Sequence, residues 1–313
     1  MNNKLEIDLI YQIAHLYYDE GLTQEQIAHQ FGFNRIKIQR YLETAKEEGI
    51  VQIAVVNPLS RCLDTEKKIK EKFNLNNVIV NPSLINNDAI IRKILGRAAA
   101  QYLNEVIQDG DHIGIGWGRT VYETLKYLQP NRKIAITVVP LIGGIGQVAA
   151  DFQVNEMARK LSEQMGGTFV PLYAPAIVDN ESIVNALFSD RNFGKVTKLW
   201  EKLDLALIGI GGKISNDSYL PISSLTDNDL KIMNNNSQVG DILMHCMDKD
   251  GSICHKSLTK RIVGISLEDL KNTKTIIAVA GSIRKKDAIL ACLKSEYIDV
   301  LITDQTIANE IIN

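Results

Sequence analysis

The sequence lacks long hydrophobic runs and paired cysteines. No apolar stretch approaches the roughly 20 residues that a helix needs to span a bilayer. Met1 to Ile10 alternates polar with apolar residues, unlike a signal peptide. The four cysteines are unevenly spread and form no CxxC pair, which fits reduced thiols better than a disulfide framework. We therefore expect a cytoplasmic protein with no membrane partner.

The chain also lacks an excess of charge of either sign. Its 35 Lys and Arg residues against 37 Asp and Glu residues give a formal net charge of -2. Bulk charge therefore does not hold the molecule to nucleic acid, and any contact with DNA must be local. Since a chain of 313 residues exceeds the usual size of a single core, we expect one small and one large domain.

Motifs for nucleotide cofactors and for hydrolases are missing or incomplete. The sequence contains no Walker A motif and no GxSxG elbow. Residues 144–149 (GIGQVA) match a GxGxxA dinucleotide pattern, but no acidic residue ends a second strand about 20 residues later. We expect neither a cofactor nor a catalytic residue.

Two histidine–cysteine pairs raise the question of a metal site. His245-Cys246 and Cys254-His255 flank residues 248–251 (DKDG), which favour a hairpin turn. Adjacent residues of a strand point to opposite faces, so the four side chains do not easily converge on one ion. The bidentate glutamate of a calcium loop is also missing. We expect no metal, and the sequence leaves the role of these four residues open.

The N-terminal region begins with a long helix followed by a short one. Apolar residues keep helical spacing over residues 5–17, and Gly21 supplies a stop. Thr23 and Gln26 then form a capping box, which predicts a second helix over residues 24–31.

A tight turn joins this second helix to a third. Gly32 permits a left-handed turn, and Asn34 caps a helix that ends at Gly49. Ala28, Gly32 and Ile38 form the specific signal. The small residue lets two helices touch, the glycine turns the chain, and the aliphatic side chain holds the second helix against the first. This order is typical of a helix-turn-helix.

The start of the third helix presents polar and basic side chains. With Ile38 and Leu42 facing inward, the outward residues can grip phosphates and bond base edges in a major groove. Gln39 and Arg40 are the best candidates for reading bases. The DNA-contacting residues that we predict are Thr23, Gln24, Asn34, Arg35, Lys37, Gln39 and Arg40.

The alternative is a three-helix packing module with a solvated basic patch. Residues 1–57 carry five basic and eight acidic side chains, so the module as a whole is acidic. Arg35, Lys37 and Arg40 nevertheless lie within six positions of one another. This concentration, rather than the total, sets the local potential and favours DNA binding.

The next segment marks the border between the two domains. Residues 51–56 (VQIAVV) alternate like a strand and predict a wing, or a lead-out, before Pro58. We expect a DNA-binding domain over residues 1–57 and an effector-binding and oligomerisation domain over residues 58–313.

The larger domain alternates strands with helices. Predicted strands run into glycines within residues 112–120 (HIGIGWGRT), 133–144 and 205–212 (LALIGIGG). Residues 275–280 (TIIAVA) lead through glycine into another helix, and residues 300–302 close the set. This alternation predicts an α/β domain with a doubly wound, mostly parallel sheet and helices on both faces.

Ligands of such folds bind at the carboxyl ends of the strands, where helix N-termini attract anions. Residues 116–120 offer main-chain amides with the side chains of Arg119 and Thr120, Gly143-Gly144 would let a ligand approach the main chain, and Lys285 follows a later strand. These groups suit a phosphate or a polyol, although the cations could also bond hydroxyls or a carboxylate. Alternatively, the glycines only turn the chain and Lys285 lies on a solvated helix face.

Essentially the whole chain resembles the SorC family of sugar-responsive bacterial regulators, which includes a deoxyribonucleoside branch. The matching segments are residues 17–28 (YYDEGLTQEQIA), 45–53 (AKEEGIVQI), 109–123 (DGDHIGIGWGRTVYE), 239–241 (VGD), 263–270 (VGISLEDL) and 279–290 (VAGSIRKKDAIL). The resemblance implies a winged helix-turn-helix joined to a domain similar to phosphosugar isomerases. It also implies a dimer of dimers on palindromic operator DNA.

The resemblance implies roles for individual residues as well. Asp241 is where a carboxylate meets ligand hydroxyls, and Lys285 is where a lysine meets the phosphate. Ile142 stands where some members of the deoxyribonucleoside branch have lysine, so we do not expect an imine with an aldehyde sugar. The implied effector-binding residues are Gly116, Trp117, Gly118, Arg119, Thr120, Gly143, Gly144, Asp241 and Lys285.

We therefore expect a DNA-binding transcriptional regulator of a carbohydrate-catabolic operon, with its operator affinity controlled by a phosphorylated sugar or polyol. The alternative is a sugar-phosphate isomerase-like enzyme with Asp241 or Glu268 as general base. The helix-turn-helix argues against an enzyme, because an isomerase has no use for it.

Overall fold

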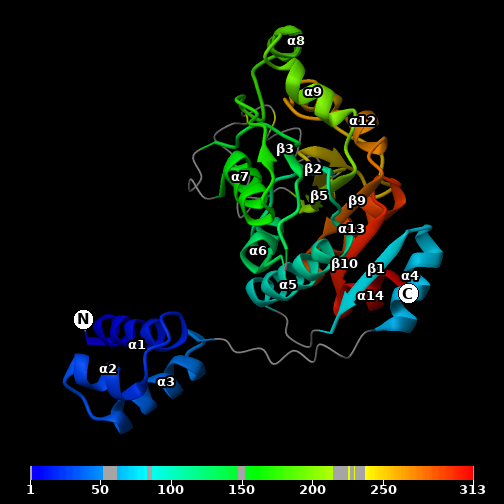
Figure 1. Cartoon of the computed structure of the whole chain (residues 1–313). Coiled ribbons are helices and arrows are strands. Elements are labelled where there is room, and N and C mark those ends of the chain that lie inside the picture. Colours follow the sequence, from blue (N-terminus) through cyan, green and yellow to red (C-terminus); the bar gives the residue numbers. More distant parts are fainter. Residues whose placement is uncertain are drawn as a thin grey trace. The chain divides into compact units, whose positions relative to one another are not determined.

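The chain divides into two compact units, Met1–Val56 and Asn57–Asn313 (Figure 1). The computed structural model describes residues 2–51, 62–82, 87–130, 132–146, 152–213, 225, 229 and 237–312. All but the first residue of the predicted wing lies outside these residues. Within them, no helix is both long enough and apolar enough to cross a membrane.

The N-terminal unit contains the three predicted helices, α1 (Asn2–Tyr18), α2 (Gln24–Phe31) and α3 (Arg35–Glu47). The capping box is present, since the Thr23 hydroxyl accepts from the Gln26 amide and the Gln26 side chain accepts from the Thr23 amide. These two bonds satisfy donors that the first turn of α2 leaves free.

The turn between α2 and α3 also forms as predicted. Gly32 adopts the left-handed conformation with φ of 66°, and the Asn34 side chain accepts from the Lys37 amide to cap α3. Ile13, Ile27 and Ile38 are fully buried where the helices meet. The helix-turn-helix prediction is therefore confirmed.

The larger unit is built on a seven-stranded parallel sheet in the order β1-β10-β9-β5-β2-β3-β4. Its strands are β1 (Asn77–Asn81), β2 (His112–Ile115), β3 (Thr137–Pro140), β4 (Thr168–Phe169), β5 (Leu205–Gly209), β9 (Thr275–Val279) and β10 (Val300–Asp304). The predicted parallel α/β architecture is confirmed. The sequence analysis did not identify the two edge strands, β1 and β4.

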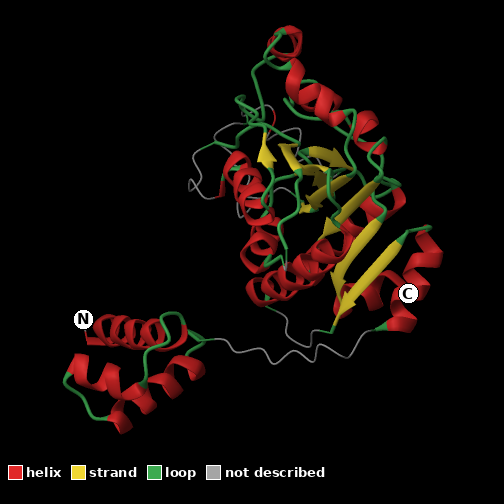
Figure 2. Ribbon diagram, viewed as in Figure 1, coloured by secondary structure: helices red, strands yellow, loops and turns green. Residues whose placement is uncertain are grey.

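Helices cover both faces of this sheet (Figure 2). One layer is formed by α5 (Asp88–Val106), α6 (Arg119–Tyr127) and α7 (Val154–Met165). The other contains α4 (Leu63–Phe73), α9 (Gly194–Trp200), α13 (Lys286–Lys294) and α14 (Gln305–Ile312). The remaining helical segments are α8 (Glu181–Ser189), α11 (Lys256–Thr259), α12 (Leu267–Lys271) and the 3-10 turn η3 (Ile283–Lys285).

A small antiparallel sheet joins β6 (Gly211–Gly212), β7 (Gly240–Ile242) and β8 (His245–Met247). It begins just beyond the carboxyl end of β5. The order in which successive strands are added reverses between β2 and β5: β3 and β4 continue on one side, and β9 and β10 on the other. Such a reversal opens a crevice at the carboxyl ends of the strands, which is where ligands of these folds bind.

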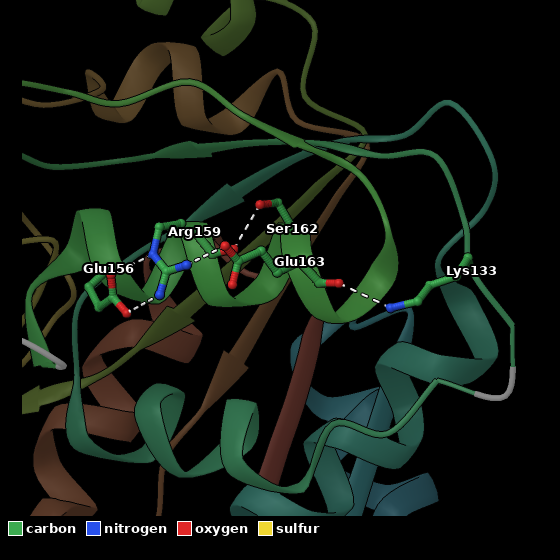
Figure 3. A network of polar contacts seen from close by, with 5 residues as sticks. All are labelled: Lys133, Glu156, Arg159, Ser162 and Glu163. Carbon is green, nitrogen blue, oxygen red and sulfur yellow. Dashed lines mark hydrogen bonds and ion pairs between the residues drawn. The ribbon is translucent and has the colours of Figure 1, made fainter.

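The third strand is shorter than the predicted span of residues 133–141. Lys133 instead caps the carboxyl end of α7, where its ammonium donates to the carbonyl oxygen of Glu163 at 3.1 Å (Figure 3). It also donates to the carbonyl oxygen of Gln164 at 3.0 Å. A cation is favourable there because the last carbonyls of a helix are unpaired. On the same helix, Arg159 bonds the carboxylates of Glu156 and Glu163.

Trp200 fixes the carboxyl end of β3. Its indole is 3% exposed, and Nε1 donates to the Pro140 carbonyl oxygen at 2.9 Å.

We expect Trp200→Phe to lower the free energy of unfolding by about 1–3 kcal/mol, because a buried carbonyl loses its donor. Urea unfolding measures this change. Tyr173→Phe, at a side chain that is 85% exposed, is the control and should have almost no effect. Equal stability of the Trp200→Phe variant would contradict the prediction.

Candidate functional site

The outward surface of α3 is a candidate DNA interface. Arg35, Lys37, Gln39 and Arg40 are all exposed, as the sequence predicts. No hydrogen bond or ion pair ties the Arg40 side chain to any residue that the structure describes. Arg40 is therefore available to a base edge or a phosphate.

The neighbouring cations are held to either side of this surface. The Arg35 guanidinium donates to Oε1 of Gln24 on α2 at 3.4 Å. The Lys37 ammonium lies 4.0 Å from the centre of the Phe33 ring, a cation–π arrangement. Gln39 donates to the carboxylate of Glu43 at 3.0 Å.

Thr23 and Asn34 cap the two helices, as the sequence predicts. Both were predicted as DNA contacts, and both side chains are engaged in capping α2 and α3. They place the N-termini of the two helices. Helix N-termini attract phosphates through their main-chain amides.

One exposed residue of α3 was missed by the sequence analysis. Ile36 is 66% exposed, and it precedes Gln39 and Arg40 by three and four positions, which puts the three on one side of the helix. The signal was present in the spacing, because Ile36 lies opposite the buried Ile38 and Leu42. The search for DNA contacts considered only polar side chains.

The second candidate site begins at the loop between β2 and α6. Gly118 is the N-cap of α6 and supplies no side-chain cap, so the first-turn amides receive no bond from the cap residue. Arg119 and Thr120 start this helix. Trp117 lies beside the loop, where its Nε1 donates to the carbonyl oxygen of Phe152 at 3.1 Å and its ring packs edge-on against the Phe152 ring. This end of α6 can accept an anion.

Asp241 and Lys285 converge on the segment that follows β5. Lys285 donates to the carbonyl oxygen of Ile210, and Asp241 pairs with Gly211 across the small sheet. A Cβ at Gly211 would lie 1.8 Å from Oδ1 of Asp241, so only glycine fits this position. The other carboxylate oxygen accepts from the Met244 amide at 3.1 Å.

Burial and neighbouring charges shift the pKa values of Asp241 and Lys285. Burial raises the pKa of Asp241 to about 6, against the opposing effects of the Met244 amide and Lys285. Burial lowers the pKa of Lys285 to about 8, Asp241 opposes this shift, and the positive charges of Arg119 and Arg92 add to it. The structure thus brings together Arg119, Asp241 and Lys285, three of the residues expected from the sequence.

The start of α5 completes the surroundings of this site. The positive charge of Arg92 lowers the pKa of Lys285. Asp88 accepts a hydrogen bond from the Ser282 hydroxyl at 2.5 Å. The Ser282 amide donates to Asp304 at the end of β10. The sequence analysis missed these residues, because α5 and the loop after β9 are far apart in the chain and charges on an amphipathic helix resemble a solvated face.

The amides of Gly143 and Gly144 are both hydrogen-bonded within the domain. Their amides donate to the carbonyl oxygens of Val263 and Ala174 at 2.8 and 2.7 Å. A Cβ at Gly143 would lie 2.5 Å from the carbonyl oxygen of Pro175. These glycines allow three segments of main chain to approach closely at the end of β3.

The β7–β8 hairpin turns through Leu243 and Met244, with φ of 48° and 67°. Two-residue hairpin turns of this kind favour glycine or asparagine, because side chains disfavour positive φ. Both side chains are 7% exposed. Surrounding contacts, rather than local preference, therefore hold this turn next to Asp241.

The histidine–cysteine segment forms the predicted hairpin. Cys254 donates through its amide to the carbonyl oxygen of Cys246, and His245 lines a separate cavity of about 430 Å³ together with Phe188 and Tyr297. Among the described residues, no three His, Cys, Asp or Glu side chains are grouped so as to hold a metal ion. Neither ring nitrogen of His245 forms a hydrogen bond of good geometry with any residue that the structure describes.

His245 should make stability depend on pH. Burial lowers its pKa to about 4, with partial opposition from the main chain of Ile265. Between pH 6.5 and 4 the unfolded chain binds a proton that the folded chain does not, so the free energy of unfolding falls as pH falls, by up to about 3 kcal/mol. His245→Phe should show a shallower fall in denaturant titrations over this range. Parallel profiles for the two proteins would contradict this.

Comparison with known proteins identifies a family and several relatives that this chain resembles. Residues 57–313 match the family "Putative sugar-binding domain". The chain is 31% identical over 304 residues to the deoxyribonucleoside regulator of Bacillus subtilis, covering 96% of each protein. It is 29% identical over 312 residues to the sorbitol operon regulator of Klebsiella pneumoniae, covering 98% of each.

The structural comparison agrees. The crystal structure of the full-length sorbitol operon regulator SorC from Klebsiella pneumoniae superposes with a TM-score of 0.77 at 28% identity, covering 98% of this chain and 99% of that one. Similarity of sequence and structure thus extends through both units. The chain belongs to the SorC family of sugar-binding transcriptional regulators.

Proposed function

We propose that this regulator binds operator DNA through α3 and that a phosphorylated sugar or polyol, held at Asp241 and Lys285, controls its operator affinity. The observation that carries the effector half is the convergence of a buried carboxylate and a half-buried ammonium on residues 210–212, beside the start of α6. An effector with both hydroxyls and a phosphate matches these two charges.

Asp241 and Lys285 would bind different parts of such an effector. Lys285, Arg119 and the first-turn amides of α6 favour the phosphate. The Asp241 carboxylate accepts hydrogen bonds from hydroxyls. The further residues that we propose to line the site are Gly116, Trp117, Gly118, Thr120, Gly143 and Gly144. Relatives are named for deoxyribonucleosides and for sorbitol, which fits a polyhydroxylated ligand.

The DNA half rests on the exposed surface of α3. A domain over residues 1–57 would place this helix in the major groove, with Arg40 and Gln39 at base edges and Arg35 and Lys37 at phosphates. The effector acts only if it prefers one arrangement of the protein, because a ligand with equal affinity for both arrangements shifts nothing. We propose that residues 58–313 assemble a dimer of dimers that provides these arrangements in the cytoplasm.

The enzyme alternative has less support. Glu268, one of the two candidate bases, lines the cavity of His245 rather than the surroundings of Lys285. Asp241 already accepts a main-chain hydrogen bond and lies beside an ammonium. We propose binding without turnover. Product formation from a sugar phosphate would favour the isomerase alternative, whereas stoichiometric binding without product would exclude it.

Arg40→Ala should weaken specific operator binding by about 1–3 kcal/mol if the guanidinium reads a guanine. Fluorescence anisotropy with the DNA upstream of the protein's own gene measures this loss. Lys46→Ala, which removes an exposed cation from the last turn of the same helix, is the matched control and should cost much less. Equal losses for the two variants would show that Arg40 contributes only charge.

Lys285→Ala should leave operator affinity unchanged and reduce the response to phosphorylated ligands, because the phosphate loses the ammonium with which it pairs. Titrating a panel of sugar phosphates and the corresponding free sugars into the protein–DNA complex tests this. Lys286→Ala is the matched control, since this neighbouring ammonium pairs with Glu310 at the surface. An unchanged response of the Lys285→Ala variant to every phosphorylated ligand would contradict the assignment.

A further inference from the structure

Ile36 lies on the outward surface of α3, in the first turn of the helix. It is the second residue of the helix and is 66% exposed, more than Ile7 or Tyr11, the next most exposed of the large apolar side chains described in the N-terminal unit. Successive residues of a helix are about 100° apart. Ile36 therefore lies opposite the buried face of α3, which contains Ile38, Leu42 and Ala45.

The side chains around Ile36 leave it uncovered. Arg35 bonds Gln24 on α2, and Lys37 lies over the Phe33 ring. These contacts draw the two flanking cations away to either side. The exposed side of α3 between these cations then consists of Ile36, Gln39 and Arg40. An apolar side chain there lies next to two polar side chains that can bond bases.

Folding gives no reason for isoleucine at this position. An exposed side chain contributes little hydrophobic stabilisation, and β-branched residues are less favourable in helices than alanine or unbranched residues. The aliphatic group is therefore better explained by something that binds to this surface. On a helix that enters the major groove, the apolar group available among base edges is the C5-methyl of thymine.

We propose that Ile36 contacts the methyl group of a thymine, so that each operator half-site prefers thymine next to the base read by Gln39 or Arg40. The inference rests on the proposed binding of DNA through α3. It adds an apolar specificity residue to the polar contacts. A thymine methyl desolvated against Ile36 contributes about fourfold in affinity, as expected for one buried carbon group.

The test separates the methyl group from every other feature of the base. Binding sites are first selected from a random duplex pool with the full-length protein, and each thymine of the selected half-site is then replaced by deoxyuridine, which lacks only the methyl. We expect one thymine per half-site at which this replacement weakens binding by about fourfold. Insensitivity at every thymine would overturn the inference while leaving the proposed function intact. Failure to enrich any sequence would overturn both.

Variants then assign the methyl contact to its residue. Ile36→Ala should lose about the same affinity and become insensitive to deoxyuridine at the critical position. Ile7→Ala makes the same change at an exposed position of α1 and should keep the full sensitivity. Retained sensitivity in Ile36→Ala would overturn the assignment. So would an altered oligomeric state of this variant in sedimentation, because Ile36 would then contact a second copy of the chain.

Discussion

The effector half of this molecule depends on two opposite charges, the buried carboxylate of Asp241 and the half-buried ammonium of Lys285, which lie against the same segment after β5. Burial alone disfavours each charge, and each is partly stabilised by the other. Removing one partner of such a pair is costly because the other charge is left uncompensated. A bound ligand that supplies hydroxyls to Asp241 and an anion to Lys285 would replace lost hydration at both. Their arrangement therefore favours a ligand that carries both kinds of group.

The topology of the sheet explains how residues far apart in the sequence reach this pair. The reversal of strand order between β2 and β5 brings the start of α6 next to the segment that leads into the small sheet. The loop after β9 delivers Lys285 to the same place, and α5 adds Arg92. No short sequence motif contains all these groups.

Local signals predicted the fold well where the determinants are local. The capping residues Thr23 and Asn34 and the turn at Gly32 set the N-terminal helices, and they are readable from a few positions. Glycine-rich strand ends likewise pointed to Arg119 and Lys285, whereas Asp241 was expected at the effector site only from the resemblance to the SorC family.

Features that depend on distant partners were not predictable. The edge strands β1 and β4 are short, and their pairing is decided by other strands. Lys133 was expected in the strand that became β3, but its side chain instead caps α7, which is formed by a later part of the chain. The amides of Gly143 and Gly144 are paired with segments that sequence spacing does not place beside them.

The turn at Leu243 and Met244 depends on the residues packed around it. Two consecutive left-handed residues cost roughly 1–2 kcal/mol each relative to their preferred conformations, so the hairpin keeps its shape only while its neighbours enclose it. Asp241 on one strand and His245 on the other are thereby carried as one piece. The carboxylate of the candidate site and the wall of the His245 cavity are therefore two sides of one hairpin, and a substitution that relaxed the turn would disturb both.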